Sequence, residues 1–154
     1  MNPIIIRPAA AEDLPQLYLF EQGIIATERP FDPTLNDDPI HYYDLAAMID
    51  AHEVALVVAE SDGVLIGSGY ARIEPAKPYL RHRLHAYLGF MYVEPAHRGK
   101  GINQMIIDAL KHWALSRNIT ELRLDVYYPN TNAIRAYEKA GFTQHLINMR
   151  LGIL

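Results

Sequence analysis

The sequence of 154 residues contains no cysteine. A chain without cysteine cannot form disulfides, attack a substrate through a thiolate, or bind zinc through sulfur. The composition agrees with a reducing compartment, so we expect a cytoplasmic protein. No apolar run comes near the roughly 20 residues that span a bilayer, and residues 1–7 show no secretion-signal pattern. We therefore expect no membrane partner.

A surplus of positive charge is missing as well. Lysine and arginine total 14 against 18 aspartate and glutamate residues, which gives a formal net charge of −4. Broad nucleic-acid binding requires a concentrated basic surface, so we expect no nucleic-acid partner. The residues are 50% hydrophobic and 21% charged, the balance of a globular protein. Because no repeat, low-complexity stretch or linker is visible, residues 1–154 are expected to form one domain.

Apolar segments predict six strands. Leu122, Leu124 and Val126 alternate with charged residues, which is typical of a half-buried strand. Ser61-Asp62-Gly63 is a turn signal between two apolar runs and predicts a hairpin. The expected strands cover residues 4–7, 54–60, 64–73, 85–93, 122–126 and 142–154.

Helical spacing predicts four helices between these strands. The clearest begins at Gly101, where apolar residues of 102–113 form one stripe. Asp38-Pro39 resembles a capping residue followed by a first-turn proline. The expected helices cover residues 11–22 (ending at Gly23), about 39–51, 101–116 and 132–140. Hairpin strands beside strand–helix–strand units predict an α/β fold with a mixed central sheet flanked by helices.

The segment 93–102 joins a predicted strand to the clearest helix through a glycine-containing turn. The free N–H groups and the positive dipole end of such a helix suit a phosphate. Gly99 and Gly101 would let a ligand approach the backbone, and Arg98 and Lys100 add positive charge. The Walker and dinucleotide patterns do not match, because Gly101 follows Lys100 and Gln104 replaces the third glycine. A tight turn with solvated basic residues is the alternative.

Two segments resemble the GCN5-related N-acetyltransferase (GNAT) superfamily. Residues 98–103, Arg-Gly-Lys-Gly-Ile-Asn, match the family's Arg/Gln-x-x-Gly-x-Gly/Ala except at Asn103. Residues 130–142 resemble a second family block, and the opening at 6–14 is similar to its first strand and helix. The resemblance extends in order over nearly the whole chain. It implies a single GNAT domain that uses acetyl-CoA as co-substrate.

The resemblance also implies roles for individual residues. The backbone of Met91 and Val93 would pair with the pantetheine arm, and Tyr137 would lie beside the sulfur as the catalytic side chain. Backbone N–H groups of 98–103 would wrap the pyrophosphate, and Asn130 would hydrogen-bond the co-substrate. The expected acetyl-CoA-binding residues are therefore Met91, Tyr92, Val93, Arg98, Gly99, Lys100, Gly101, Ile102, Asn103 and Asn130.

The implied reaction is direct transfer of an acetyl group to a primary amine of a small molecule or a protein. A non-catalytic acyl-CoA sensor or interaction module of the same fold is the first alternative. A nucleotide-binding protein that uses the Gly99 turn is the second. Homodimers are common in the family, so a homodimer is an expectation that the resemblance allows. The acceptor amine is not identified by the sequence.

The acceptor site is expected around an acidic stretch with interleaved aromatic residues before and into the second predicted helix. A solvated helix start explains this stretch equally well. The candidate substrate-binding residues are Glu28, Phe31, Tyr42 and Tyr87. A lysine-like amine has a pKa of about 10.4 and must lose a proton, for which Glu28, Tyr87, His85 and bound water are candidates. His82 and His85 lack a further ligand at a recognisable spacing, so no metal is expected.

Overall fold

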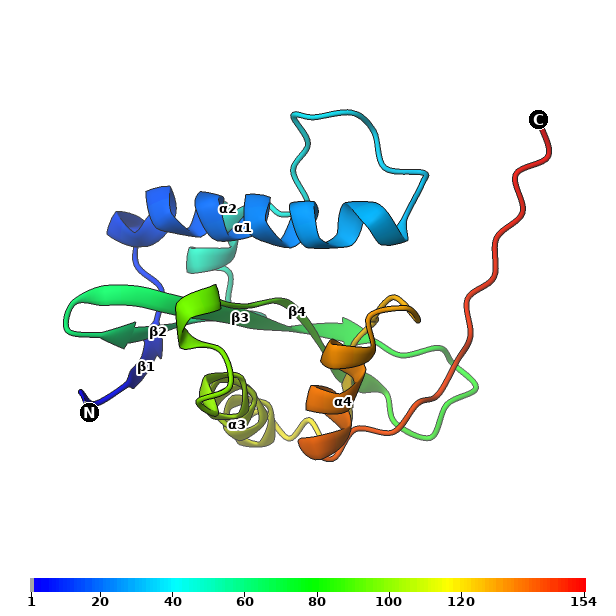
Figure 1. Cartoon of the computed structure of the whole chain (residues 1–154). Coiled ribbons are helices and arrows are strands. Elements are labelled where there is room, and N and C mark those ends of the chain that lie inside the picture. Colours follow the sequence, from blue (N-terminus) through cyan, green and yellow to red (C-terminus); the bar gives the residue numbers. More distant parts are fainter. Residues whose placement is uncertain (1) are drawn as a thin grey trace.

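A five-stranded mixed sheet forms the middle layer of the computed structural model, which describes residues 2–154 (Figure 1). The strands lie in the order β1-β2-β3-β4-β5; the first four are antiparallel to their neighbours and β5 is parallel to β4. Their bounds are β1 (Ile5–Pro8), β2 (Val54–Ser61), β3 (Val64–Pro75), β4 (Leu84–Val93) and β5 (Leu122–Arg123). The expected α/β fold with a mixed sheet is confirmed.

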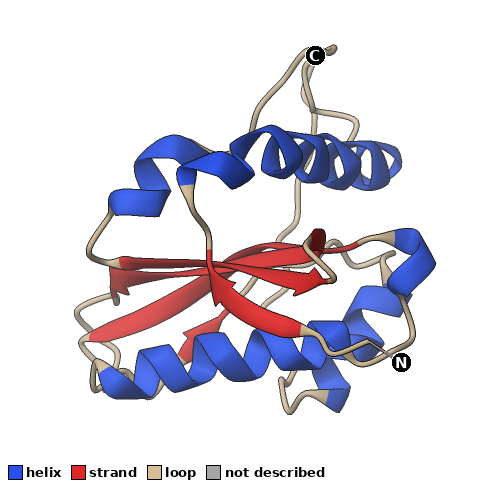
Figure 2. Cartoon of the chain, turned by 90° about the vertical axis from the view of Figure 1, so that its left-hand side faces the viewer, coloured by secondary structure: helices blue, strands red, loops and turns tan. Residues whose placement is uncertain are grey.

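Helices cover both faces of the sheet (Figures 1 and 2). The bounds are α1 (Leu14–Glu28), α2 (Leu45–Asp50), α3 (Ile102–Ser116) and α4 (Thr131–Lys139), with 3-10 turns η1 (Ala11–Asp13), η2 (Arg29–Phe31) and η3 (Pro95–His97). Helices α1 and α2 lie on one side, and α3 and α4 on the other. Within residues 2–154, no helix combines the length and the apolar character needed to cross a bilayer.

Each face of the sheet has its own apolar core, and strand alternation divides the residues between them. Val58 and Tyr70 are buried with α1 and α2, whereas their neighbours Ala59 and Ala71 are buried with α3. Successive strand residues point to opposite faces, so a sheet covered on both sides buries both sets. This explains why residues 54–59 of β2 form a continuous apolar run.

The hairpin between β2 and β3 has the expected turn. Ser61 pairs with Val64, and the two residues between them, Asp62 and Gly63, have φ angles of 52° and 76°. Positive φ at both central residues matches the twist of the flanking strands. The predicted hairpin is therefore confirmed.

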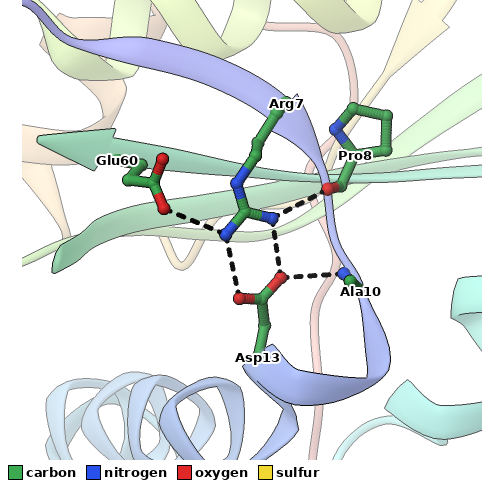
Figure 3. A network of polar contacts seen from close by, with 5 residues as sticks. All are labelled: Arg7, Pro8, Ala10, Asp13 and Glu60. Atoms are coloured by element: carbon green, nitrogen blue, oxygen red, sulfur yellow. Dashed lines mark hydrogen bonds and ion pairs between the residues drawn. The ribbon is translucent and has the colours of Figure 1, made fainter. Parts of the chain in front are cut away.

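Arg7 fastens the first strand to its surroundings (Figure 3). Its guanidinium donates to both carboxylate oxygens of Asp13, at 2.8 and 3.0 Å, and to Glu60 at 3.2 Å. Asp13 also accepts from the N–H of Ala10 at 2.8 Å. The hydrogen bond from Arg7 is the main cause that lowers the pKa of Asp13. The network holds β1 against β2 and sets the start of α1.

The prediction that the first helix ends at Gly23 is wrong, because α1 continues to Glu28. An ideal Cβ at position 23 would lie 2.8 Å from the ring of Tyr92, so glycine admits that ring against the helix. Glycine inside a helix costs only about 1 kcal/mol, and the buried Ile24 and Ile25 that follow more than offset this cost.

The predicted helix over 39–51 is also largely wrong. Residues 32–44 form a loop with only turns, and α2 covers Leu45–Asp50, with Asp44 accepting from the N–H of Ala47 at 3.2 Å. The buried carboxylate of Glu21 accepts from the N–H groups of Tyr42 and Tyr43, each at 2.9 Å. These backbone donors are therefore already paired before a helix begins.

The C-terminal part differs most from expectation. The strand predicted over 122–126 is reduced to Leu122–Arg123, and residues 142–154 form neither a helix nor a strand. Instead of lying along β5, the segment runs from α4 past the sheet into solvent (red in Figure 1). A strand needs a partner edge for its backbone groups, and this segment pairs with no strand of its own chain.

Candidate active site

The edge of β4 that faces β5 is open over most of its length. The two strands pair only at Ala86 with Leu122 and Tyr87 with Arg123. Further along β4, a bulge shifts the register against β3, and Phe90 adopts a φ of 56°. The hydroxyl of Ser68 donates to the carbonyl of Phe90 at 2.9 Å in the buried interior. A bulge bends its strand, so the second half of β4 presents free backbone groups to an extended ligand.

The start of α3 offers a site for an anion. Gly101 has a φ of 81° and no side chain caps the helix, so the first N–H groups of α3 keep their hydrogen-bonding capacity. An ideal Cβ at Gly99 or Gly101 would meet nothing within 4 Å. A phosphate therefore has both donors and open space at this turn.

Arg98 stabilises the turn through its side chain. Its Nε donates to the carbonyl of Val93 at 3.0 Å, and its guanidinium lies 5.9 Å from the ring centroid of Tyr92. The Tyr92 ring stacks on Phe20 at 4.8 Å, toward the α1 core. The side chain of Tyr92 is thus packed within the protein, its backbone lies opposite Ser68 of β3, and the carbonyl of Val93 is already engaged by Arg98.

Asn130 begins α4 as its capping residue. Its side-chain oxygen accepts from the N–H of Ala133 at 3.3 Å. The cap sets the orientation of the helix that carries Tyr137. A structural role for Asn130 is therefore established, whereas its contact with a co-substrate stays a prediction.

Tyr137 lies partly buried on α4, with its ring 5.8 Å from that of Phe142. Burial, and to a smaller degree the charge of Glu28, raise the pKa of Tyr137 to about 12. The phenol is therefore protonated at neutral pH. It can act as a hydrogen-bond donor or as a general acid.

Glu28 is the last residue of α1, and its charge reaches Tyr137. Burial raises the pKa of its carboxyl, and the charge of Asp32 adds to the effect. The Tyr42 hydroxyl acts in the opposite direction on this pKa, yet it falls outside hydrogen-bond geometry and has no partner within residues 2–154. Glu28 is therefore free to accept a proton.

Asp32 has the opposite electrostatic character. It accepts hydrogen bonds from the Thr34 hydroxyl and from the Tyr127 hydroxyl, each at 2.5 Å. These two bonds are the leading causes that lower the pKa of Asp32 to about 2. Asp32 is therefore a fixed negative charge at neutral pH, whereas Glu28 is the carboxyl that titrates more easily.

The structure brings most of the predicted acceptor residues together. Phe31 lies beside Tyr127, with ring centroids 6.1 Å apart. The charges of Glu28 and Asp32 and the nearby Tyr42 all raise the pKa of Tyr127, although burial is the largest cause. The sequence did not point to Tyr127, and it placed Asp32 in the acidic stretch expected at the acceptor site but not among the candidate substrate-binding residues. The alternation that places Tyr127 on the same face as Arg123 and Asp125 was the available signal.

The loop at 32–44, which carries Asp32 and Tyr42, is attached to α1. Glu21 binds the N–H groups of Tyr42 and Tyr43, and it also contacts Nδ1 of His41 at 2.8 Å. Gln22 donates to the carbonyl of Ile40 at 3.1 Å. Because Glu21 is fully buried, its carboxylate is a costly group to leave unpaired. The attachment therefore fixes the loop beside Glu28.

The other base candidates are less suitable. The Tyr87 hydroxyl donates to Asp125 at 3.0 Å, and burial followed by the charge of Asp125 raises the pKa of Tyr87. A phenol with a raised pKa is a poor base at neutral pH. His85 precedes Met91 by six strand residues, about 20 Å along β4, and its Nε2 lies 3.5 Å from Glu74. Neither joins the cluster around Glu28.

The surface has two hollows, and one of them adjoins the cluster around Glu28. A hollow of about 340 Å³ beside α2 adjoins the cluster through Tyr42 and extends to Tyr70 and Arg72. A second, of about 210 Å³, lies over the loop at 76–83. Among residues 2–154, no three histidine, aspartate or glutamate side chains are grouped so that they could hold a metal ion.

The geometry combines an anion-binding turn, an open strand edge and a protonated tyrosine, and sequence comparison agrees with it. The model of the Acetyltransferase (GNAT) family matches residues 18–142. The chain belongs to this family.

Curated relatives of this GNAT protein include antibiotic acetyltransferases. An aminoglycoside N(6')-acetyltransferase type 1 from Klebsiella aerogenes is 28% identical over 100 residues, 65% of this chain and 66% of that enzyme. A streptothricin acetyltransferase from Escherichia coli is 40% identical over 58 residues, 38% of this chain and 33% of that enzyme. The chain thus matches less than two thirds of the length of either relative.

Solved structures share the fold over almost the whole chain. A tetramutant of the BH1408 protein from Bacillus halodurans has a TM-score of 0.85 at 20% identity and covers 97% of this chain and 99% of its own. A predicted acetyltransferase with acetyl-CoA from Clostridium acetobutylicum has a TM-score of 0.75 at 19% identity, covering 98% and 97%. At these identities the comparison establishes the fold alone.

Proposed function

We propose that this GNAT protein transfers an acetyl group from acetyl-CoA to a primary amine of a cationic small molecule. The observation that carries the proposal is the cluster in which Asp32 accepts from the Tyr127 hydroxyl, Phe31 packs on the Tyr127 ring, and the charge of Glu28 reaches Tyr137. Acetyltransferases for aminoglycosides and streptothricin among the relatives support a small-molecule acceptor.

The start of α3 and the open edge of β4 offer backbone groups that suit acetyl-CoA. The N–H groups at the start of α3 and the open turn at Gly99 and Gly101 would bind its pyrophosphate. The free edge of β4 near Met91 would pair with its extended arm. Asn103 stands where the family has glycine or alanine, and its side chain would lie close to the phosphates. The co-substrate supplies the activated acetyl group.

The cluster provides the two proton transfers that the reaction needs. Glu28 would take the proton that the amine must lose, because a carboxylate with a raised pKa is a stronger base. As the nitrogen–carbon bond forms and the carbon–sulfur bond breaks, Tyr137 would donate its proton to the departing sulfur. Asp32 would hold a second cationic group of the acceptor through its fixed charge.

The test is release of free thiol from acetyl-CoA across a panel of amines. The panel comprises an aminoglycoside, streptothricin, a lysine-containing peptide, a neutral arylamine and an amino acid with a net negative charge. We expect turnover to be fastest with a polycationic small molecule. Preference for the peptide or for the anionic amine would contradict the proposed acceptor class.

The non-catalytic alternative is tested with the same material. Calorimetry should show that acetyl-CoA binds, whereas ATP and NAD should not bind at the Gly99 turn. If acetyl-CoA binds and no amine releases thiol, the chain is an acyl-CoA sensor. If ATP or NAD binds in place of acetyl-CoA, the Gly99 turn is a nucleotide site.

A further inference from the structure

Two neighbouring histidines, one in the loop between β3 and β4 and one on β4, bury ring nitrogens that nothing satisfies. Nε2 of His82 and Nδ1 of His85 are shielded from solvent, and neither has a hydrogen-bond partner within residues 2–154. The two rings have centroids 5.8 Å apart. Buried polar atoms normally have a partner, so two unpaired nitrogens in neighbouring rings point to a group that they would bind together.

Backbone hydrogen bonds fix the loop that carries His82. The N–H of Ala76 donates to the carbonyl of Arg83 at 2.9 Å, which closes the base of the loop. On β4, His85 lies directly opposite Glu74 of β3, and its side chain is only 13% exposed. Both rings are therefore attached to an ordered framework at the start of β4, whereas the Gly99 turn follows the end of that strand.

Glu74 orients the ring of His85. Its Oε1 lies 3.5 Å from Nε2 of His85, while its Oε2 accepts from the Arg72 guanidinium at 2.6 and 2.9 Å. A carboxylate beside Nε2 favours the tautomer that carries its proton there, which leaves the lone pair on the buried Nδ1. Histidines that bind metal ions almost always have this arrangement, with one nitrogen on the ion and the other facing a carboxylate or carbonyl.

The space between the rings suits a metal ion better than a water molecule or a phosphate. An imidazole nitrogen binds Zn²⁺ at about 2.0–2.1 Å, so two rings on one tetrahedral ion have centroids about 5.2 Å apart. The 5.8 Å separation differs from this value by a small movement of the loop. A hydrogen-bonded oxygen would have to lie about 2.7–3.2 Å from each nitrogen, and the burial of both nitrogens leaves no such room.

We propose that His82 and His85 bind one divalent transition-metal ion, through Nε2 and Nδ1 respectively. Imidazole ligands suit Zn²⁺, Ni²⁺ and Cu²⁺. Two protein ligands leave positions for water or an anion, and the adjoining hollow of about 210 Å³ is lined by His82 with Lys77 and Arg83, whose charges favour an anion there. The site stands independently of the proposed reaction, because His85 does not join the cluster around Glu28.

The sequence predicted no metal at these histidines because their spacing shows no third ligand. Neither the burial of the two nitrogens nor the position of Glu74 behind His85 can be recognised from that spacing. Both depend on the pairing of β3 with β4, which brings residues 74 and 85 together.

The first test is calorimetric titration of the metal-free full chain with Zn²⁺. Wild type should bind one ion per chain, and His82→Gln and His85→Gln should each lower the affinity at least about tenfold. Glu74→Gln should lower it about 10–100-fold, the usual effect of removing a carboxylate behind a metal-binding histidine. His112→Gln, at an exposed histidine of α3, is the matched control and should bind as wild type does.

A wild type without measurable Zn²⁺ binding would overturn the proposal, as would an affinity that both His82→Gln and His85→Gln leave unchanged. Thermal melts in EDTA check that the variants are folded. His82 lies in the loop outside the strands, so its variant should melt as wild type does in EDTA, and only wild type should gain stability when Zn²⁺ is added.

The second test identifies the ligating nitrogens by NMR of the ¹⁵N-labelled histidine side chains. Zn²⁺ should shift Nε2 of His82 and Nδ1 of His85, and the two glutamine variants assign these signals. Inorganic phosphate, added in place of Zn²⁺, should leave both signals unchanged. Coordination through Nε2 of His85, or a response to phosphate and not to Zn²⁺, would show that the two histidines do not form this metal site.

Discussion

At the scale of single residues, Tyr137 is the most direct test of the proposed chemistry. Its pKa, raised to about 12, keeps the phenol protonated, so it can protonate a departing thiolate. We expect Tyr137→Phe to lower kcat by about 10²–10⁴-fold, the usual contribution of general-acid catalysis. The affinity for acetyl-CoA, measured by calorimetry, should stay close to wild type.

Tyr87→Phe is the matched control for this variant. It also removes a phenolic hydroxyl, but one that donates to Asp125 outside the Glu28 cluster. We expect only a small change in kcat for this control. If Tyr137→Phe keeps full kcat with chemistry rate-limiting, the hydroxyl has no part in transfer.

Glu28 makes a second prediction at this scale, through pH. Burial raises the pKa of its carboxyl above 4.5, so the carboxylate forms only at higher pH than in an ordinary glutamate. Above that pKa, wild type can deprotonate a bound ammonium group. Glu28→Gln lacks this base and can use only the fraction of the amine that binds already unprotonated. The ratio of wild-type to variant kcat/KM should therefore shrink as pH rises from 7 toward the amine pKa.

Asp37→Asn is the control for Glu28→Gln, because Asp37 is an exposed carboxylate of the neighbouring loop. Its ratio to wild type should be near one at every pH. A Glu28→Gln ratio that is large but constant with pH would mean that Glu28 shapes the site without taking the proton.

At the scale of elements, the start of α3 depends on backbone conformation. Gly101 adopts a φ of 81° with open space around it, so Gly101→Ala meets no atom but places an L-residue in the left-handed region. Such a residue costs about 1–2 kcal/mol and tends to change the turn. We expect acetyl-CoA affinity, measured by calorimetry, to fall about tenfold or more.

Gly63→Ala is the control that separates weaker acetyl-CoA binding from the backbone strain of an alanine at positive φ. Gly63 has a φ of 76°, also with nothing within 4 Å, but it lies in the β2–β3 turn. Both variants should lose similar stability in thermal melts, and only Gly101→Ala should bind acetyl-CoA more weakly. Equal affinities for the two variants would remove the phosphate site from this turn.

The loop at 32–44 supplies the second prediction for an element. In Glu21→Ala, the N–H groups of Tyr42 and Tyr43 both lose their shared acceptor, Oε2 of Glu21, so the anchor of the loop is lost. We expect about 1–3 kcal/mol less stability in urea unfolding and a higher KM for the amine. His41→Ala removes only the mostly exposed partner and should cost less than about 1 kcal/mol.

At the scale of the whole molecule, local patterns in the sequence predicted the central layer. The hairpin of β2 and β3, the apolar β4 and the stripe of α3 depend on alternation, turn residues and helical spacing within one segment. The glycine turn at 99–101 was likewise visible because its residues are adjacent. These elements needed no knowledge of the rest of the chain.

Features that depend on distant residues could not be predicted in this way. Gly23 stays inside α1 because the ring of Tyr92 packs there, and the 32–44 loop is fixed by Glu21. Asp32 joins the site through Tyr127, a residue 95 positions away. The short β5 reflects its separation from β4 beyond Tyr87, which no local pattern of 122–126 records.

The charge distribution of the molecule yields the last prediction. The net charge is −4, and Asp32 stays ionised at any pH well above about 2. A fixed anion near the acceptor cluster attracts cationic amines over a distance that salt shortens, since the Debye length falls from about 30 Å at 0.01 M to about 10 Å at 0.1 M. We therefore expect kcat/KM for a polycationic amine to fall several-fold between these salt concentrations.

A monoamine with no second charge is the matched substrate control, and its kcat/KM should change much less with salt. In Asp32→Asn the advantage of the polycationic amine should shrink, and the remaining salt dependence should follow the overall charge of the protein. Because Asp32 titrates far below neutral pH, the wild-type preference should be constant from pH 6 to 8. A preference that survives Asp32→Asn at low salt would assign acceptor recognition to other residues of the cluster.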